Sequence, residues 1–137
     1  MDTDFLDAHE RHWKDAESLF RNSRWANADH LYGVAAECGL KKLMVVFGMK
    51  TKPHGKPEDE RDCAHANKVW ARYDAYRSKC PFATAYGLPP KNLFHDWDVC
   101  QRYAKESHFD RACAERHQAG AALVRRLLSQ AKKDGLI

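Results

Sequence analysis

Apolar side chains recur every three to four positions along most of the chain, the spacing that places them on one face of an α-helix. Over residues 3–22 this stripe predicts a first helix. A second stripe over residues 25–47 predicts a helix that ends near Gly48, because a glycine commonly follows a helix C-terminus. Gly33 and Gly39 lie inside this second helix, and we expect them to mark the close approach of another helix.

The rest of the chain carries further helical stripes, separated by loops rich in proline and glycine. A proline followed by three acidic residues marks one helix start, since acidic side chains interact favourably with the positive end of the helix dipole. An aspartate before the last stripe is a good N-cap. The predicted helices cover residues 57–76, 92–104 and 110–135, and no segment alternates as a half-buried strand would.

These elements predict an all-α fold. We expect an antiparallel up-and-down bundle of four long helices and one shorter helix, because the connections are short. The chain has 137 residues, which favours a single domain over residues 1–137, since domains commonly have roughly 100–150 residues.

The charge and hydropathy narrow the expected partners and location. The net charge of +4 and the pI near 8.8 are compatible with an RNA partner but do not by themselves predict one. No apolar run approaches the roughly 20 residues that span a membrane, so we expect no membrane association. The N-terminus is acidic, unlike a secretory signal or a transit peptide, and the cytoplasm is therefore the expected location.

The five cysteines are widely spaced and form no Cys-x-x-Cys pair, which argues against a disulfide scaffold or a structural zinc site. Cys113 and His117 do lie one helical turn apart, and so do His9 and His12. Neither pair has an evident third and fourth ligand. The sequence therefore predicts no metal site and no other cofactor.

The strongest chemical signal is Arg102, followed six positions later by His108. An arginine stays charged and binds phosphate through a planar fork of donors, and a histidine exchanges protons near neutral pH. On one unbroken helix the two side chains would point to different faces, about 240° apart. They converge only if the helix ends or bends between them, as the nearby capping signals indicate. In the alternative, Arg102 forms a surface ion pair with Glu106 or Asp98, and His108 is an ordinary loop residue.

Three segments, in this order, resemble the HEPN superfamily of all-helical proteins, whose signature is an arginine followed four to six residues later by a histidine. The first covers residues 30–41 (HLYGVAAECGLK) and the second residues 65–70 (HANKVW). The third runs from Trp97 to His108 and contains Arg102. The resemblance implies a HEPN-like helical domain and a homodimer in which two copies of the signature face each other.

Active members of this superfamily are metal-independent ribonucleases, and the resemblance implies the same activity here. His108 would act as the general base on a ribose 2′-hydroxyl or as the acid to the leaving 5′-oxygen. Arg102 would bind the scissile phosphate, and the product would be a 2′,3′-cyclic phosphate. Such a protein would serve as a toxin or in phage defence, with a nucleotidyltransferase-type antitoxin as a partner. The alternative is a catalytically inactive dimeric HEPN-like module that binds a nucleotide, an RNA or a partner protein.

Other polar side chains are candidates for supporting this site. Glu37 is flanked by small residues, so we expect a partly buried carboxylate that pairs with Arg102 or Lys41 and orients the arginine. In the alternative, Glu37 is an ordinary exposed acid. His65 is either a supporting group or a structural histidine. Tyr103, directly after the arginine, is expected in the core.

Further candidates lie at the start of the last predicted helix. Arg111 is a candidate for contacting substrate phosphate, and so are Arg116 and His117 on the same helix. Glu106 completes the set of candidates, as a supporting acid or as the ion-pair partner of Arg102.

Overall fold

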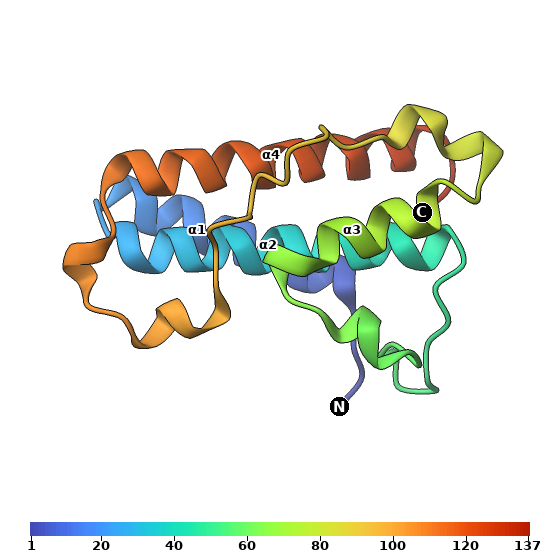
Figure 1. Cartoon of the computed structure of the whole chain (residues 1–137), viewed down its shortest axis with the longest axis horizontal. Helices are drawn as coiled ribbons and strands as arrows, with labels where there is room; N and C mark the ends of the chain where they lie inside the picture. The colour runs from blue at the N-terminus through green and yellow to red at the C-terminus, as the bar shows by residue number, and fades with distance from the viewer.

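The computed structural model of the protein describes residues 1–137 and contains four α-helices, four short 3-10 helices and no β-strand (Figure 1). The all-α class is therefore confirmed. The α-helices are α1 (Phe5–Arg21), α2 (Trp25–Val46), α3 (Ala66–Arg77) and α4 (Arg111–Lys133). The 3-10 helices are η1 (Glu60–Cys63), η2 (Pro81–Tyr86), η3 (Val99–Tyr103) and η4 (Glu106–His108). None of the helices is long and apolar enough to cross a membrane.

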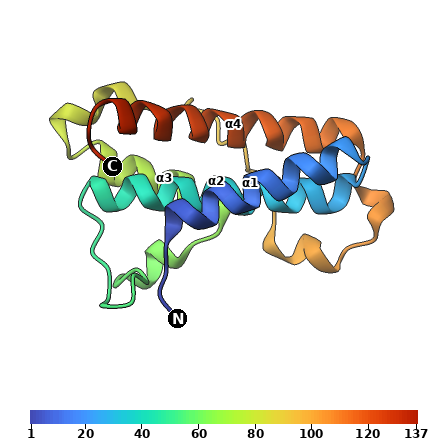
Figure 2. The ribbon, with the colours of Figure 1, turned by 180° about the vertical axis from the view of Figure 1, so that it is seen from behind.

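Helix α1 runs antiparallel to both α2 and α4 (Figures 1 and 2). A tight turn joins α1 to α2, and Ser23 in this turn has a left-handed backbone with φ of 57°. Against α4, His9 near the start of α1 contacts Arg125, whereas Glu17 two turns later contacts Gln118. The residue numbers of the contacts on α4 fall as those on α1 rise, so the two helices are antiparallel.

Helices α2 and α4 run in the same direction. Asp29 near the start of α2 contacts His117 near the start of α4, and Gly39 farther along α2 faces Val124. The chain from residue 47 to residue 110 returns to the end of the bundle where α2 began, as long crossover connections do in helical bundles. The predicted up-and-down alternation is therefore wrong beyond the α1–α2 pair.

Gly39 of α2 allows a close helix contact, as predicted, whereas Gly33 faces Trp97, which lies outside any helix. A Cβ atom added to Gly39 would lie 2.5 Å from Val124 Cγ1 and 2.8 Å from His9 Nδ1. Both distances are far below van der Waals contact. Only a glycine lets α1 and α4 approach α2 this closely at this position.

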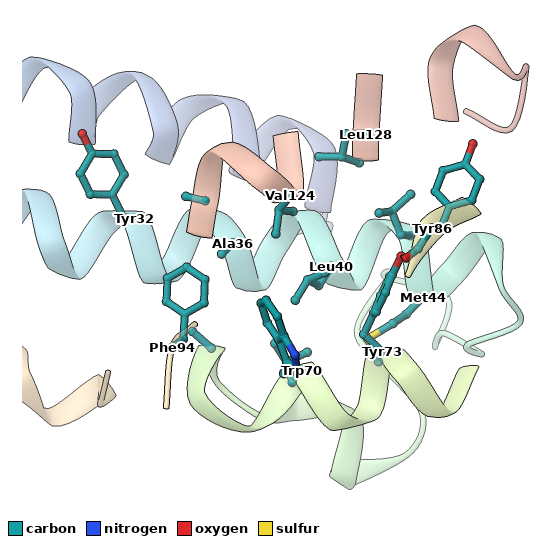
Figure 3. Close-up of a cluster of buried hydrophobic side chains, with 14 of the residues drawn as sticks. Tyr32, Ala36, Leu40, Met44, Trp70, Tyr73, Tyr86, Phe94, Val124 and Leu128 are labelled. Carbon is teal, nitrogen blue, oxygen red and sulfur yellow. The ribbon is translucent and has the colours of Figure 1, made fainter. Parts of the chain in front are cut away.

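Helix α2 contributes more side chains to the core than any other helix, and they face α3, α4 and the chain that crosses between them. Figure 3 shows this cluster, which includes Tyr32, Ala36, Leu40, Met44, Trp70, Tyr73, Tyr86, Phe94, Val124 and Leu128. Removing these apolar surfaces from water is the main favourable contribution to folding. The core therefore fixes α2 as the central helix of the molecule.

Helix α3 begins at Ala66 and not at Pro57. Before it, the buried carboxylate of Asp62 accepts hydrogen bonds from Arg72 Nε and from the Tyr76 hydroxyl, both at 2.6 Å. Both donors lie on α3, so the chain must turn back between η1 and α3 to bring Asp62 to them. This tertiary contact overrides the helix-start signal of the proline and the acidic residues that follow it.

The predicted helix over residues 92–104 is absent, and only η3 is helical there. Phe94 and Trp97 are buried, but they enter the core from an irregular segment. Trp97 fills the groove above Gly33, where an added Cβ would lie 2.1 Å from the indole Nε1. Phe94 lies against Gly120 of α4 in the same way, at 2.8 Å. Their spacing of three residues imitates a helix, although each aromatic ring fills its own glycine groove.

Candidate functional site

The segment from Asp98 to Asp110 links this irregular crossing to α4 and projects from one end of the molecule (orange in Figure 1). The Asp98 side chain caps η3 by accepting from the Cys100 backbone N–H at 2.7 Å, and Asp110 caps α4 in the same way. Between η3 and η4 the backbone is extended at Ala104 and Lys105. The predicted break between Arg102 and His108 is therefore confirmed, although a short 3-10 helix precedes it.

Arg102 and His108 are both exposed on this segment. Neither side chain forms a hydrogen bond or an ion pair, and no hydrogen bond joins one to the other. The Asp98 carboxylate caps its own helix, and Glu106 faces Arg24 at 4.0 Å. The alternative surface ion pairs of Arg102 are therefore not formed, and its guanidinium remains available to a ligand.

Tyr103 lies on the surface and not in the core, with 78% of its area exposed. The Arg102 guanidinium lies 4.9 Å from the centroid of its ring. The prediction was wrong because Tyr103 lies on η3, none of whose residues is buried, whereas Trp97 is the aromatic residue of this stretch that enters the core. An exposed aromatic ring next to a guanidinium is the arrangement on which proteins stack nucleic-acid bases.

A depression of about 190 Å³ lies beside Arg102. Its lining includes the side chains of Arg24 and Asn27, at the start of α2, and Glu106 on the facing segment. Two guanidinium groups at one small concavity suit a phosphate group, because each offers several donors in a fixed plane. His108 is not part of this lining.

His30 is a neighbour of Arg102 that the sequence analysis did not single out. Its imidazole stacks on the Trp97 indole at 5.5 Å, and its Nδ1 is buried without a hydrogen-bond partner. Burial lowers the pKa of His30, and the charge of Arg102 lowers it further. His30 therefore carries a neutral imidazole close to the arginine. Only the tertiary approach of Trp97 to Gly33 creates this environment, so no local sequence signal could identify it.

Glu37 and His65 are brought together, but not with the other candidates. Glu37 lies on α2 and accepts from Lys41 Nζ at 2.7 Å and from His65 Nδ1, just before α3, at 3.2 Å. Its side chain is only 14% exposed, which confirms the predicted partly buried carboxylate. Its partner is Lys41, and neither Glu37 nor His65 contacts Arg102 or His108.

The basic residues of α4 have partners within the chain. Arg111 donates to Glu115 at 2.7 Å, and its guanidinium lies over the rings of Phe20 and Trp25. Its charge is thus already balanced by an acid, which weakens the expected phosphate contact. Arg116 is paired with an aspartate, and His117 is buried, so a phosphate contact by His117 is excluded.

A buried polar network fixes the segment that carries Arg102. His117 Nδ1 lies 2.5 Å from Asp29 Oδ1, and His117 Nε2 lies 3.1 Å from Asp96 Oδ1. Gln101 donates from Nε2 to Asp29 Oδ2 at 2.6 Å, and Cys113 Sγ lies 3.4 Å from Asp29 Oδ1. Because these partners are far apart in sequence, the network was not predicted. It ties η3 to α2 and α4.

No family model matches the chain, and no curated protein or solved structure matches it. The function is therefore inferred from the segment between Asp98 and Asp110 and from its neighbours.

Proposed function

We propose that the protein is a metal-independent endoribonuclease of the HEPN-like type, acting as a homodimer through Arg102 and His108. The observation that carries the proposal is the state of these two side chains. Both are exposed on one short projecting segment, and neither is used in an internal ion pair or hydrogen bond. A phosphate-binding cation and a proton-transfer group that are free for a ligand are the two groups that RNA cleavage by the 2′-hydroxyl requires.

In this proposal Arg102 binds the scissile phosphate and neutralises the charge that develops on it in the transition state. His108 takes the proton from the ribose 2′-hydroxyl or gives a proton to the leaving 5′-oxygen. The 2′-oxygen bonds to phosphorus while the bond to the 5′-oxygen breaks, which leaves a 2′,3′-cyclic phosphate. The neutral imidazole of His30 lies close enough to feel the charge of Arg102 and would contribute a polar group to the same site.

The proposed dimer would supply what one chain lacks. Arg102 and His108 of one chain do not contact each other, and the depression beside Arg102 does not include His108. Two copies with their projecting segments face to face would bring Arg102 of one near His108 of the other. A closed two-fold dimer makes both such contacts at once. A toxin or phage-defence role, with a nucleotidyltransferase-type antitoxin as a partner, belongs to this proposal.

A second function is favoured by a specific observation, the exposed Tyr103 ring beneath the Arg102 guanidinium. Base stacking and a phosphate contact are sufficient for binding without cleavage. The protein would then be a dimeric, non-catalytic HEPN-like module that holds a nucleotide, an RNA or a partner protein at the same segment.

Incubation of the purified protein with tRNA in EDTA separates these two functions. The enzyme proposal predicts cleavage with 2′,3′-cyclic phosphate ends, since no step uses a metal. The module predicts a mobility shift of the RNA without new ends. If tRNA, mRNA and rRNA are neither cut nor bound, the enzyme proposal and RNA binding by the module are both wrong.

A further inference from the structure

We propose that Asp29, Cys113 and His117 form a binding site for a divalent transition metal, with zinc as the metal that suits it best. Their three ligand atoms, a carboxylate oxygen, a thiol sulfur and an imidazole nitrogen, all lie within 4.8 Å of one another. The proposal is independent of the ribonuclease function.

The distances are close to those of a tetrahedral site. Zinc bonds of about 2.0–2.3 Å place neighbouring ligand atoms roughly 3.3–3.7 Å apart. Cys113 Sγ already lies 3.4 Å from Asp29 Oδ1. His117 Nδ1 lies 2.5 Å from the same oxygen, so these two atoms must separate by somewhat less than 1 Å. A small side-chain rotation achieves this when a metal ion replaces the proton between them.

The ligands stand on rigid elements. Cys113 and His117 lie one turn apart on α4, which places both side chains on one face of the helix. Asp29 lies on α2, the central helix, and reaches this face because α2 and α4 run in the same direction. Cys113 and His117 are the pair for which the sequence offered no third ligand, and Asp29 supplies it.

The surroundings of the cluster provide a second, independent observation. A metal-bound histidine usually donates its other ring N–H to a carboxylate, which fixes the ring and the tautomer. His117 has this arrangement, because its Nε2 faces Asp96 Oδ1 at 3.1 Å while its Nδ1 faces the cluster. The second oxygen of Asp29 is likewise held, by Gln101 Nε2 at 2.6 Å. Asp29 and His117 are thus each held through one polar atom by a neighbouring side chain, and their other polar atoms face each other in the cluster.

The chemistry of the donors selects the metal. A thiolate and an imidazole favour zinc and its neighbours in the transition series over magnesium or calcium, which prefer oxygen ligands. Three protein ligands leave a fourth position for water. Binding displaces the Cys113 thiol proton and the proton shared by Asp29 and His117. Cys113 is only partly buried, so the metal can enter beside it.

Metal binding would stiffen the segment that carries Arg102, because Gln101 is held by Asp29 and directly precedes the arginine. The metal would hold this segment in place and would not take part in RNA cleavage. The hydrogen bonds of the network are complete without it, so the chain stays folded in EDTA.

Titration of the EDTA-treated, full-length protein with Co²⁺, followed by Zn²⁺ competition, tests the site. We expect one equivalent of Co²⁺ to give a thiolate-to-cobalt charge-transfer band and the visible spectrum of a tetrahedral ion, and Zn²⁺ to abolish both. Zinc should also raise the melting temperature. In Cys113→Ser the charge-transfer band should disappear.

Two further variants complete the experiment. Cys100→Ser is the matched control, since Cys100 is exposed and outside the cluster, and it should keep the full spectrum. Asp96→Asn removes the carboxylate that supports His117, together with its ion pair to Arg116, and should weaken the affinity roughly 10–100-fold. Its carboxylate is on the surface, so this variant is expected to fold even if changes at Asp29 do not. The absence of any cobalt band, or a band that persists in Cys113→Ser, would overturn the proposal.

Discussion

His9 shows how a single buried side chain makes the stability of this bundle depend on pH. The ring is fully buried, its Nδ1 donates to the Ala35 carbonyl oxygen at 2.8 Å, and its Nε2 accepts from Arg125 at 3.3 Å. Burial lowers the pKa of His9, and the Arg125 charge lowers it further. The folded protein therefore keeps this imidazole neutral where the unfolded chain protonates it.

This difference predicts a loss of stability in acid. In the unfolded chain the histidine titrates near pH 6.5, so the contribution of His9 is complete above that pH. It falls as the pH drops from about 6.5 toward the lower folded-state pKa, by up to about 1.4 kcal/mol per pH unit. Urea unfolding at pH 7.5 and 5.5 should show a smaller acid loss for His9→Asn than for the wild type. His54→Asn, at an exposed histidine, should lose as much as the wild type. Equal losses in all three proteins would refute the role of His9.

Two other single residues, Arg102 and His108, carry the proposed chemistry. His108→Ala should slow RNA cleavage by about 10²–10⁴-fold, because the proton-transfer group is lost. Arg102→Ala should cost a similar factor through lost charge stabilisation. Both residues are exposed and unpaired, so the free energy of unfolding should change by less than about 0.5 kcal/mol. His54→Ala is the matched control and should cleave at the wild-type rate. Full activity in His108→Ala would remove the mechanism.

The position of η3, and of the irregular segment before it, depends on the groove at Gly33. A methyl group at this position would lie 2.1 Å from Trp97 Nε1, inside the indole ring system. Gly33→Ala should therefore displace Trp97 and with it the segment that carries Arg102. We expect a stability loss of about 1–3 kcal/mol, as for other overpacked sites. A loss of RNA cleavage should accompany it at temperatures where the variant is folded.

Gly87→Ala is the control for this change, because an added Cβ there meets only Thr84 O, at 3.8 Å. Urea unfolding together with the cleavage assay makes the comparison. A Gly33→Ala protein as stable and as active as Gly87→Ala would show that Trp97 does not position the segment.

Some of the helices could be predicted from the sequence, and others could not. Helices α1, α2 and α4 were predictable because their apolar stripes are continuous and their ends carry local signals, such as the Asp110 cap and Gly48. The helix predicted over 92–104 was not formed, because Phe94 and Trp97 are held by distant glycines. Periodicity records which residues are apolar, but it cannot distinguish a helix from an irregular segment whose side chains fill separate grooves.

Part of the candidate site could also be predicted from the sequence, and part could not. Arg102, His108 and the break between them follow from the local sequence. The position of Glu37 in a partly buried ion pair was also predictable from its small neighbours. The network around Asp29 and His117 was not, because it joins residues 88 positions apart.

At the scale of the whole molecule, the parallel course of α2 and α4 brings the start of both helices and the projecting segment to one end. Arg24, Arg102 and His108 all lie exposed at this end, and the Arg102 guanidinium there has no ion-pair partner. We propose that two copies meet here. A specific interface of this kind buries more than about 1,000 Å².

Mixing two inactive variants tests this composite site most directly. Arg102→Ala and His108→Ala proteins, shown to be dimers by light scattering, are unfolded together, refolded and assayed on tRNA. If each site takes Arg102 from one chain and His108 from the other, every mixed dimer contains one intact site. Random mixing should then restore about a quarter of the wild-type activity, since half of the dimers are mixed and each has one of its two sites intact. A mixture as inactive as either variant alone, beside an active wild type, would contradict the composite site, and an inactive wild type would contradict the enzyme.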